Sequence, residues 1–326
     1  MTAPAKPPLY VVENLRLDMV LPGGPLALLQ RSDRRVLNIL DDISLQVERG
    51  ETLGLVGESG SGKTTLARAM LGLLPISSGK LSMNGQELTP GNMAQLRRAT
   101  AMMFQDPIAS LSPRMRVGDL VTEPFIIHGP RPADRAATAR ALLAQVGLPP
   151  EMAQRYPHEL SGGQARRVCT ARALALEPAF VIADEPTAGL DVSVQGEILN
   201  LLADLKEQRG ISFLIITHNL AVIRHTSDRI GILYLGRLVE SGPTREVFRA
   251  PAHPYTASLI ASEPDPDPRR RRQELAIKGE IPSLLRRPSG CEFHSRCPIA
   301  EVICHQTRPS LRQIAPGRSV RCHLAG

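Results

Sequence analysis

A glycine-rich stretch early in the chain has the residue types of a phosphate-binding loop. Residues 57–64 read GESGSGKT, which matches the pattern Gly-x4-Gly-Lys-Ser/Thr in full. In such a loop the backbone N–H groups face phosphate oxygens, and the glycines allow the backbone to approach them closely. Lys63 is then expected to reach the β- and γ-phosphates, and the Thr64 hydroxyl to bind Mg²⁺. The alternative is a glycine turn that precedes Lys-Thr by chance.

Two adjacent carboxylates follow an apolar run that reads FVIADEP. If the run is a strand, Asp184 lies at the carboxyl edge of the sheet, where it can hold a magnesium shell. Glu185 projects differently and can polarise an attacking water as a general base. The alternative is an acidic strand end at the start of a helix, where carboxylates are favoured anyway.

A third stretch, LSGGQARRVCTARAL at residues 160–174, predicts a second anion-binding helix start. Ser161, Gly162 and Gly163 precede a helical pattern, and the N–H groups of a helix N-terminus attract anions. One nucleotide does not need two such cradles in one chain. The second cradle is therefore expected to serve a nucleotide bound to another subunit.

Four of the five cysteines lie in the last 36 residues, with the spacing C-x5-C-x6-C-x17-C. The short C-x2-C knuckles typical of zinc sites are missing, so zinc is possible but not required. Four thiolates also suit an iron–sulfur cluster, and disulfides rank third because a cytosolic location keeps thiols reduced. Cys169 is expected to be a small packing residue. The clustered cysteines are Cys291, Cys297, Cys304 and Cys322, with His294, His305 and His323 nearby.

The elements that must position these residues read as an α/β domain. TLGLVG, AFVIADEP and ISFLIITHN are short apolar runs of the kind found in buried parallel strands, and each is followed by a helical pattern. Alternating strands and helices predict a mainly parallel sheet. Residues 107–165 show helical patterns only and predict a helical insert. Residues 1–9 are expected to be loose, and a separate segment is expected from residue 251 onward.

Composition and charge exclude several classes of protein. No apolar run approaches the roughly 20 residues needed to cross a bilayer, and the start of the chain lacks the apolar stretch of a signal peptide, so a cytosolic location is expected. The net charge is +7, and residues 265–326 contribute +6 of it through twelve basic and six acidic residues. No basic face with interleaved aromatics is visible, so no nucleic-acid partner is expected. RRRR at 269–272 predicts a solvated linker, with an anionic membrane surface as the alternative partner.

Five motifs in order, GESGSGKTT, FQDP, LSGGQ, VIADEPTAGLD and ITHN, resemble the nucleotide-binding subunits of ATP-binding cassette (ABC) transporters. The resemblance covers about residues 10–250 and implies an ATPase with a P-loop core, a helical subdomain and bound Mg²⁺. It implies that Gln105 and His218 act with Glu185 in catalysis, and that Asp191 belongs to a loop facing the partner subunit. The residues expected to contact nucleotide are Gly57, Glu58, Ser59, Gly60, Ser61, Gly62, Lys63, Thr64, Thr65, Gln105, Ser161, Gly162, Gly163, Gln164, Asp184 and Asp191. Those expected to hold Mg²⁺ are Thr64, Gln105 and Asp184.

Three further stretches narrow the resemblance to the ATPase subunits of oligopeptide and dipeptide importers, closer to the second of their two ATPases. These are QDPIASLSPRMRVGDLVTEPF, HPYTASL and the four-cysteine segment within 251–326. The resemblance implies import of di- or oligopeptides and a four-iron four-sulfur cluster on the cysteines, with zinc as the alternative. It also implies a peripheral location on the cytoplasmic face of the membrane. The implied partners are a second ATPase in a homo- or heterodimer, two permeases and an extracytoplasmic substrate-binding protein.

Alternatives remain open at this level. The chain could serve a non-transport complex, or an importer of another small solute such as a nickel chelate or glutathione. The sequence also departs from the family pattern, because residues 16–47 contain no aromatic residue to stack on adenine. Tyr10 lies too near the start to be a convincing substitute, and Gly189 and Asn219 stand where other residues are usual.

Overall fold

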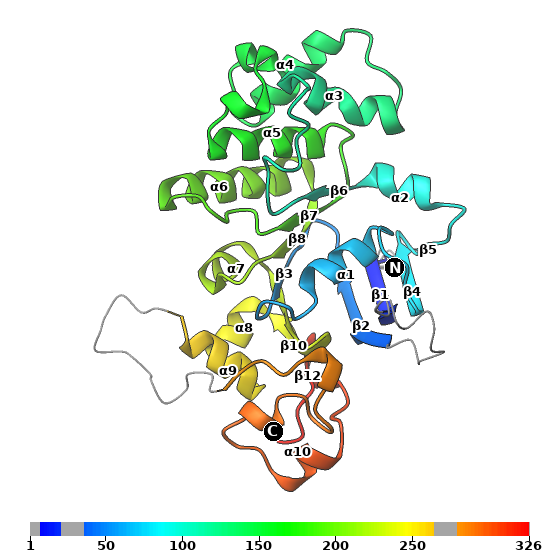
Figure 1. Cartoon of the computed structure of the whole chain (residues 1–326), viewed down its shortest axis with the longest axis vertical. Helices are drawn as coiled ribbons and strands as arrows, with labels where there is room; N and C mark the ends of the chain where they lie inside the picture. The colour runs from blue at the N-terminus through cyan, green and yellow to red at the C-terminus, as the bar shows by residue number, and fades with distance from the viewer. Residues whose placement is uncertain (1–6, 21–35, 264–278, 326) are drawn as a thin grey trace, which may run out of the picture. The chain divides into compact units, whose positions relative to one another are not determined.

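The computed structural model describes residues 7–20, 36–263 and 279–325, which form two compact units (Figure 1). The first unit comprises Met1–Tyr10, Gln46–Leu53 and Ser82–Thr217. The second comprises Val11–Leu45, Gly54–Leu81 and His218–Gly326. Most of the predicted loose tail and the whole Arg269–Arg272 run lie outside the described residues.

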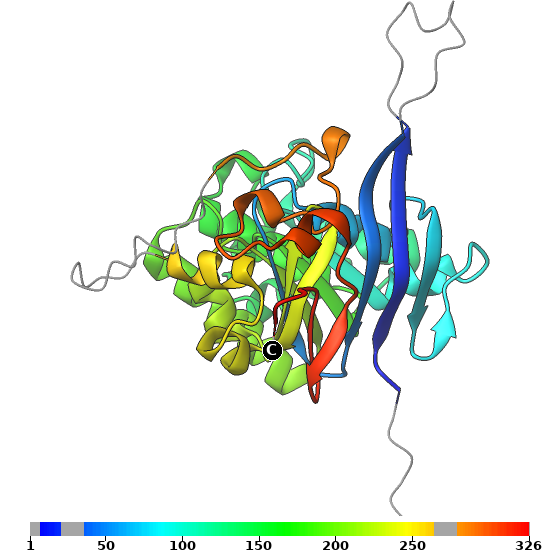
Figure 2. The ribbon, with the colours of Figure 1, turned by 90° about the horizontal axis from the view of Figure 1, so that it is seen from below.

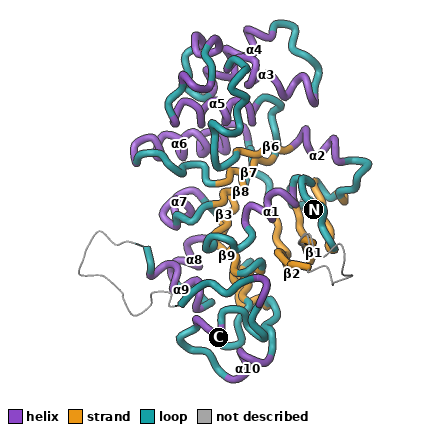
Figure 3. Tube along the Cα trace, viewed as in Figure 1, coloured by secondary structure: helices purple, strands orange, loops and turns teal. Residues whose placement is uncertain are grey.

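Three parallel strands form the sheet of the first unit. They lie in the order β8 (Ser212–Ile216), β7 (Phe180–Asp184) and β6 (Thr100–Met103), with Val181 opposite both Phe213 and Ala101 (Figure 3). Every residue of β7 and β8 is buried, as expected for apolar runs covered on both faces of a parallel sheet. The predicted α/β fold with a parallel sheet is therefore confirmed.

Helices make up much of the rest of the first unit. α3 (Val117–His128), α4 (Arg135–Gln145) and α5 (Gly162–Leu174) pack on one another, and the Asp134 carboxylate caps α4 by accepting from the Ala137 N–H. Two 3₁₀ turns, Pro150–Gln154 and Pro157–Glu159, connect α4 to α5. The helical region predicted at 107–165 thus contains α3 and α4, and α5 runs past its end. The remaining helices of this unit are α2 (Met93–Ala99) and α6 (Val192–Arg209).

The second unit contains two sets of strands. β2 (Val36–Val47), β1 (Tyr10–Val20) and β4 (Ser78–Met83) are neighbours in that order, and β1 and β2 run side by side in Figure 2. β5 (Gln86–Glu87) forms a hairpin with the end of β4 in the first unit. β3 (Thr52–Val56) begins in the first unit and ends in the second.

The other set is antiparallel, in the order β11 (Arg312–Ala315), β12 (Arg318–Val320), β10 (Arg237–Pro243) and β9 (Arg229–Tyr234). β11 and β12 belong to the cysteine-bearing C-terminal segment, so this segment adds two strands to the β9–β10 pair. The helices of this unit are α1 (Lys63–Met70), α7 (Leu220–Thr226), α8 (Thr244–Arg249), α9 (Pro254–Ala261) and α10 (Val302–Gln306). None of the helices in the described ranges has both the length and the apolar character to cross a membrane.

Candidate nucleotide-binding site

The glycine-rich loop lies in the second unit, between the end of β3 and the start of α1. At Gly57 an added Cβ would lie 2.2 Å from the Leu233 carbonyl oxygen, so no side chain fits there. Gly60 and Gly62 have φ angles of 77° and 102°, which L-residues with a Cβ rarely adopt. The glycines of the motif are therefore required by the shape of the loop.

Lys63 lies across this loop. Its ammonium donates to the carbonyl oxygens of Gly57 at 2.7 Å and Glu58 at 2.9 Å. Gly62, the residue before α1, makes no side-chain hydrogen bond to the helix. Thr64 and Thr65 follow in the first turn and are half-buried. Backbone donors and a cation at one helix start form the arrangement that binds phosphate groups.

The two predicted carboxylates lie in the first unit. Asp184 is the last residue of β7 and is 3% exposed. Glu185 has a φ of 50°, and its N–H donates to the Ile216 carbonyl at 2.7 Å. Its Oε2 accepts a hydrogen bond of 2.9 Å from the Thr217 hydroxyl. Left-handed backbone at a glutamate costs about 1 kcal/mol or more and is concentrated at functional sites.

One residue in contact with the predicted site that the sequence did not reveal is Arg166, on α5. Its buried guanidinium donates to the backbone oxygens of Glu185 at 3.0 Å, Ala188 at 2.9 Å and Gln105 at 3.3 Å. Desolvation lowers the pKa of Arg166, and charge interactions with Cys169, Asp106 and Glu185 act against it. Arg166 thus joins the helix that follows LSGGQ to the chain around both Gln105 and Glu185.

The predicted second cradle forms the capped start of α5. The Ser161 hydroxyl accepts from the Gln164 N–H at 3.3 Å, and the Gln164 side chain accepts from the Ser161 N–H at 3.0 Å. This reciprocal pair is a capping box. A Cβ at Gly163 would lie 3.0 Å from the Val194 side chain of α6. The glycine therefore allows the starts of α5 and α6 to approach each other.

The remaining predicted residues are exposed. Asp191 caps α6, its carboxylate accepting from the Val194 N–H at 3.0 Å. His218 and Gln105 are both exposed, His218 at the start of the second unit and Gln105 in the first. Asn219 caps α7 by accepting from the Ala221 N–H at 3.0 Å, which accounts for asparagine after His218 because asparagine is a favoured N-cap.

Tyr10 is excluded as an adenine contact. It is fully buried, and its ring centroid lies 5.4 Å from that of Phe180 in the first unit. Burial raises the pKa of its hydroxyl. Tyr10 is therefore a core residue.

The four clustered cysteines have free thiols in the C-terminal part of the second unit. The Cys291 N–H donates to the Cys304 carbonyl at 2.8 Å. Burial raises the pKa of Cys291 to about 12 and also raises that of Cys297. Across residues 7–20, 36–263 and 279–325, no group of three or more Cys, His, Asp or Glu side chains is arranged to hold a metal ion. The structure therefore does not support the predicted cluster or its zinc alternative.

The predicted site residues fall into two sets. The second unit holds Gly57–Thr65 and His218, and the first unit holds the other set. Within the first unit, Arg166 connects the backbone at Gln105 with that at Glu185. The predicted site residues in the first unit are Gln105, Ser161, Gly162, Gly163, Gln164, Asp184, Glu185 and Asp191.

Comparison with known proteins identifies the family of the chain. The family model for ABC transporters matches residues 40–188, and that for the C-terminal region of oligopeptide/dipeptide transporters matches residues 239–304. A putative peptide import ATP-binding protein of Brucella abortus (strain 2308) is 48% identical over 296 residues, which cover 89% of this chain and 88% of that protein. The probable peptide ABC transporter ATP-binding protein y4tS of Sinorhizobium fredii (strain NBRC 101917 / NGR234) is 47% identical over 295 residues, which cover 89% and 83%.

Solved structures agree with this assignment. The dimeric ATP-binding cassette MJ0796 in a post-hydrolysis state, bound to ADP and Pi, is 27% identical, with a TM-score of 0.63 over 72% of this chain and 99% of that one. The cbiO1 protein of Clostridium perfringens, part of the cbiONQ transporter complex, is also 27% identical, with a TM-score of 0.62 over 74% and 91%. The chain therefore belongs to the ABC transporter family, as an ATP-binding subunit with the C-terminal region of the oligopeptide/dipeptide type.

Proposed function

We propose that this ATPase energises the import of di- or oligopeptides through a membrane ABC transporter. The observation that carries the proposal is the combination, in one chain, of the Lys63 loop and the buried Glu185 with a C-terminal region of the peptide-transporter type. Relatives that share most of the chain carry the name peptide import ATP-binding protein. We also propose that residues 10–250 form an ATPase domain and residues 251–326 a C-terminal extension.

The chemistry we propose follows from the residues of each unit. The loop N–H groups bind the phosphates of ATP, and the Lys63 ammonium leaves the Gly57 and Glu58 carbonyls to bind the β- and γ-phosphates. Thr64, Gln105 and Asp184 would supply the oxygen ligands that Mg²⁺ prefers, and the ion would neutralise phosphate charge when bound. Glu185 accepts the proton of the attacking water, and His218 contacts the γ-phosphate.

The proposed partners follow from the second cradle. Ser161, Gly162 and Gly163 open α5 with exposed or half-buried residues, so we propose that they close on a nucleotide held by a second ATPase, identical or related. The exposed Asp191 at the start of α6 faces the same partner. Two permeases and an extracytoplasmic substrate-binding protein complete the transporter, and the chain acts at the cytoplasmic face of the membrane.

Reconstitution tests this function. The chain would be co-expressed with permeases and a second ATPase of a peptide importer from the same organism and placed in lipid vesicles, and labelled peptide uptake would be measured. We expect ATP-dependent uptake, and hydrolysis that rises when peptide-loaded binding protein is added. The unloaded binding protein and a nickel chelate serve as controls. Uptake of the chelate but not of peptide, or failure of the chain to associate with any permease, would contradict the proposal.

The iron–sulfur cluster remains a prediction for Cys291, Cys297, Cys304 and Cys322. What supports it is the number of thiols in one extension and the sequence resemblance given above. Protein purified without oxygen should be brown and contain about four irons per chain if the cluster is present. Substituting Cys304 with Ser should then remove both properties. Colourless protein without iron would exclude the cluster, and one zinc per chain would favour the alternative.

A further inference from the structure

The C-terminal extension contacts the phosphate-binding loop directly, through Arg296 and Glu58. The two guanidinium nitrogens Nη1 and Nη2 donate to the Glu58 carboxylate oxygens at 2.7 and 2.9 Å. The Arg296 side chain is 4% exposed and that of Glu58 is 21% exposed. A two-point arginine–carboxylate pair fixes geometry as well as charge. Glu58 is the second residue of the loop that begins at Gly57.

The backbone of Glu58 is held on both sides as well. Its N–H donates to the Tyr255 hydroxyl at 2.9 Å, and its carbonyl accepts from the Lys63 ammonium at 2.9 Å. Tyr255 is fully buried in the first turn of α9, in the stretch HPYTASL. Every polar group of Glu58 therefore has a partner, and two of these partners come from the chain beyond residue 250.

Aromatic rings surround the Arg296 guanidinium of this pair. The Arg296 guanidinium lies 5.8 Å from the ring centroid of Tyr234 and 5.9 Å from that of Phe293. The Tyr234 ring is 4.6 Å from Tyr255 and meets Phe293 edge-on at 5.3 Å. The hydrogen bond to Glu58 raises the pKa of Arg296. Ion pairs with little access to water are screened less by salt than those on an open surface.

Arg296 is itself fixed by the turn that joins Cys291 to Cys297. The His294 N–H donates to the Cys291 carbonyl at 3.0 Å, and the Arg296 N–H to the Phe293 carbonyl at 3.0 Å. The Cys297 N–H closes the turn on the His294 carbonyl at 3.3 Å. Movement of this turn therefore moves the guanidinium that holds Glu58.

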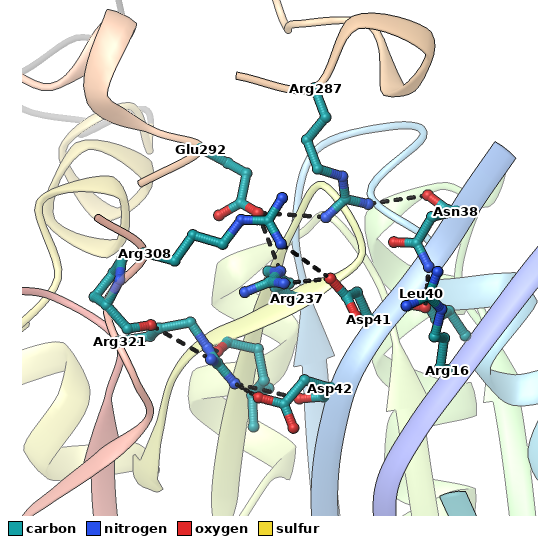
Figure 4. A network of polar contacts seen from close by, with 12 residues as sticks. Arg16, Asn38, Leu40, Asp41, Asp42, Arg237, Arg287, Glu292, Arg308 and Arg321 are labelled. Carbon is teal, nitrogen blue, oxygen red and sulfur yellow. Dashed lines mark hydrogen bonds and ion pairs between the residues drawn. The ribbon is translucent and has the colours of Figure 1, made fainter. Parts of the chain in front are cut away.

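A network of arginines also joins the extension to β2 and β10 (Figure 4). The Arg237 Nε lies 3.0 Å from the Glu292 carboxylate, and Arg237 also pairs with Asp41 of β2. Arg287 donates to the Asn38 carbonyl at 3.0 Å, and Arg321 pairs with Asp42 at 2.9 Å. Burial acts to raise the pKa of Asp41, but the hydrogen bond and charge of Arg237 outweigh it and the pKa is lowered.

The same network reaches the loop at a second point. Gly236, next to Arg237, donates its N–H to the Ser61 carbonyl at 2.8 Å and accepts at its own carbonyl from the Asp41 N–H at 2.9 Å. A Cβ at Gly236 would lie 1.8 Å from the Ile39 carbonyl oxygen, so only glycine allows this approach. The loop is thus fixed at two points, by the Gly236 hydrogen bond to Ser61 and by the Arg296 ion pair with Glu58.

We propose that Arg296 is a positioning residue for ATP binding, through which the Cys291–Cys297 turn sets the conformation of the phosphate-binding loop. The inference rests on the proposed role of that loop in binding ATP. Arg296 acts through Glu58 and contacts no phosphate itself. Because the pair fixes the Glu58 peptide, loss of either partner releases the start of the loop, and ordering it again weakens ATP binding.

A double-mutant cycle in the purified full chain tests the proposal. The dissociation constant for ATP and the kcat and KM of hydrolysis would be measured for Arg296→Gln, Glu58→Gln and the double variant. We expect each single variant to bind ATP about tenfold more weakly than the wild type, with kcat changed about twofold at most. The double variant should bind ATP no more weakly than either single variant. Arg296→Lys keeps the charge but loses the two-point geometry, so its dissociation constant for ATP should lie between those of the wild type and Arg296→Gln.

The cycle separates positioning from simple electrostatics. If charge alone mattered, Glu58→Gln would remove a negative charge beside the phosphates and tighten ATP binding. Such tightening, or additive losses in the double variant, would overturn the proposal. Arg312→Gln is the matched control, because Arg312 is a cation of the same extension that bonds to the Cys322 and Ala325 carbonyls, and it should bind ATP as the wild type does.

A conservative variant distinguishes loss of a contact from misfolding. Tyr255→Phe keeps the buried ring and removes only the hydroxyl that accepts from the Glu58 N–H, and we expect several-fold weaker ATP binding with thermal unfolding near that of the wild type. Unchanged binding in both Tyr255→Phe and Arg296→Lys would contradict the proposal. A wild-type chain that binds no ATP would instead contradict the proposed function, so the two failures are distinguishable.

Discussion

Glu185→Gln is expected to leave ATP binding unchanged and to lower ATP hydrolysis by about a hundredfold to ten-thousandfold, the usual contribution of a general base. The amide oxygen of Gln can still accept from the Thr217 hydroxyl, and the backbone bond from residue 185 to the Ile216 carbonyl is unaffected. The change therefore removes the basic oxygen while the surrounding geometry remains. ATP binding by equilibrium dialysis and single-turnover hydrolysis would measure the two effects separately.

Glu177→Gln is the matched control for this substitution. Glu177 lies in the same unit, is exposed, and has the same φ of 50° as Glu185. It precedes β7, whereas Glu185 follows it. The control variant should hydrolyse ATP at the wild-type rate. Wild-type turnover in Glu185→Gln would remove Glu185 from the role of base, and equal loss in both variants would point to backbone strain as the cause.

Arg166→Met is expected to lower both stability and turnover. The substitution keeps an apolar side chain of similar length but removes the guanidinium donor from the carbonyl oxygens of Gln105, Glu185 and Ala188. The Glu185 carbonyl still accepts from the Ala188 N–H at 3.1 Å. Hydrogen bonds to charged groups contribute about 1.5–3 kcal/mol each, so we expect the free energy of unfolding to fall by about 3 kcal/mol. Because the released backbone carries both Gln105 and Glu185, kcat should fall about a hundredfold with a smaller change in KM.

Arg167→Gln provides the control, since it alters the next residue of the same helix. Arg167 donates to the Val146 carbonyl at 2.7 Å and pairs with Glu197, whose side chain is 56% exposed. An exposed pair of this kind contributes about 0–1 kcal/mol. Urea unfolding and steady-state hydrolysis would be measured for both variants. The role of Arg166 would be refuted if its variant lost no more activity than the Arg167 variant.

The parts of the site that follow from local chemistry could be predicted from the sequence. A phosphate-binding loop needs glycines at fixed offsets, and Gly57 and Gly62 have the restricted geometry that explains this pattern. The strands β7 and β8 were predictable because parallel strands buried on both faces require continuous apolar runs. In these cases a few neighbouring residues carry the whole signal.

Contacts between distant residues could not be predicted in this way. Arg166 bonds to backbone oxygens, which every residue possesses, so no residue type at its partners' positions indicates the contact. Glu58 and Arg296 are 238 residues apart, and neither charge differs in sequence from an ordinary surface charge. For the four cysteines, the sequence pattern is clear but the geometry does not follow from it. Their spacing predicts shared chemistry, but it does not determine whether the backbone brings the thiols into ligand geometry.

The ion pair between Arg296 and Glu58 bears on how far the extension is a separable module. In a chimaera that carried the extension of a relative, the ion pair to the phosphate-binding loop would form only under two conditions. The turn must have an arginine at the position of Arg296, and residue 58 must remain acidic. The two positions must therefore be inherited, or transplanted, together. Two segments 238 residues apart thus share one compatibility requirement, and the cysteine-bearing extension is matched to one particular ATP-binding loop.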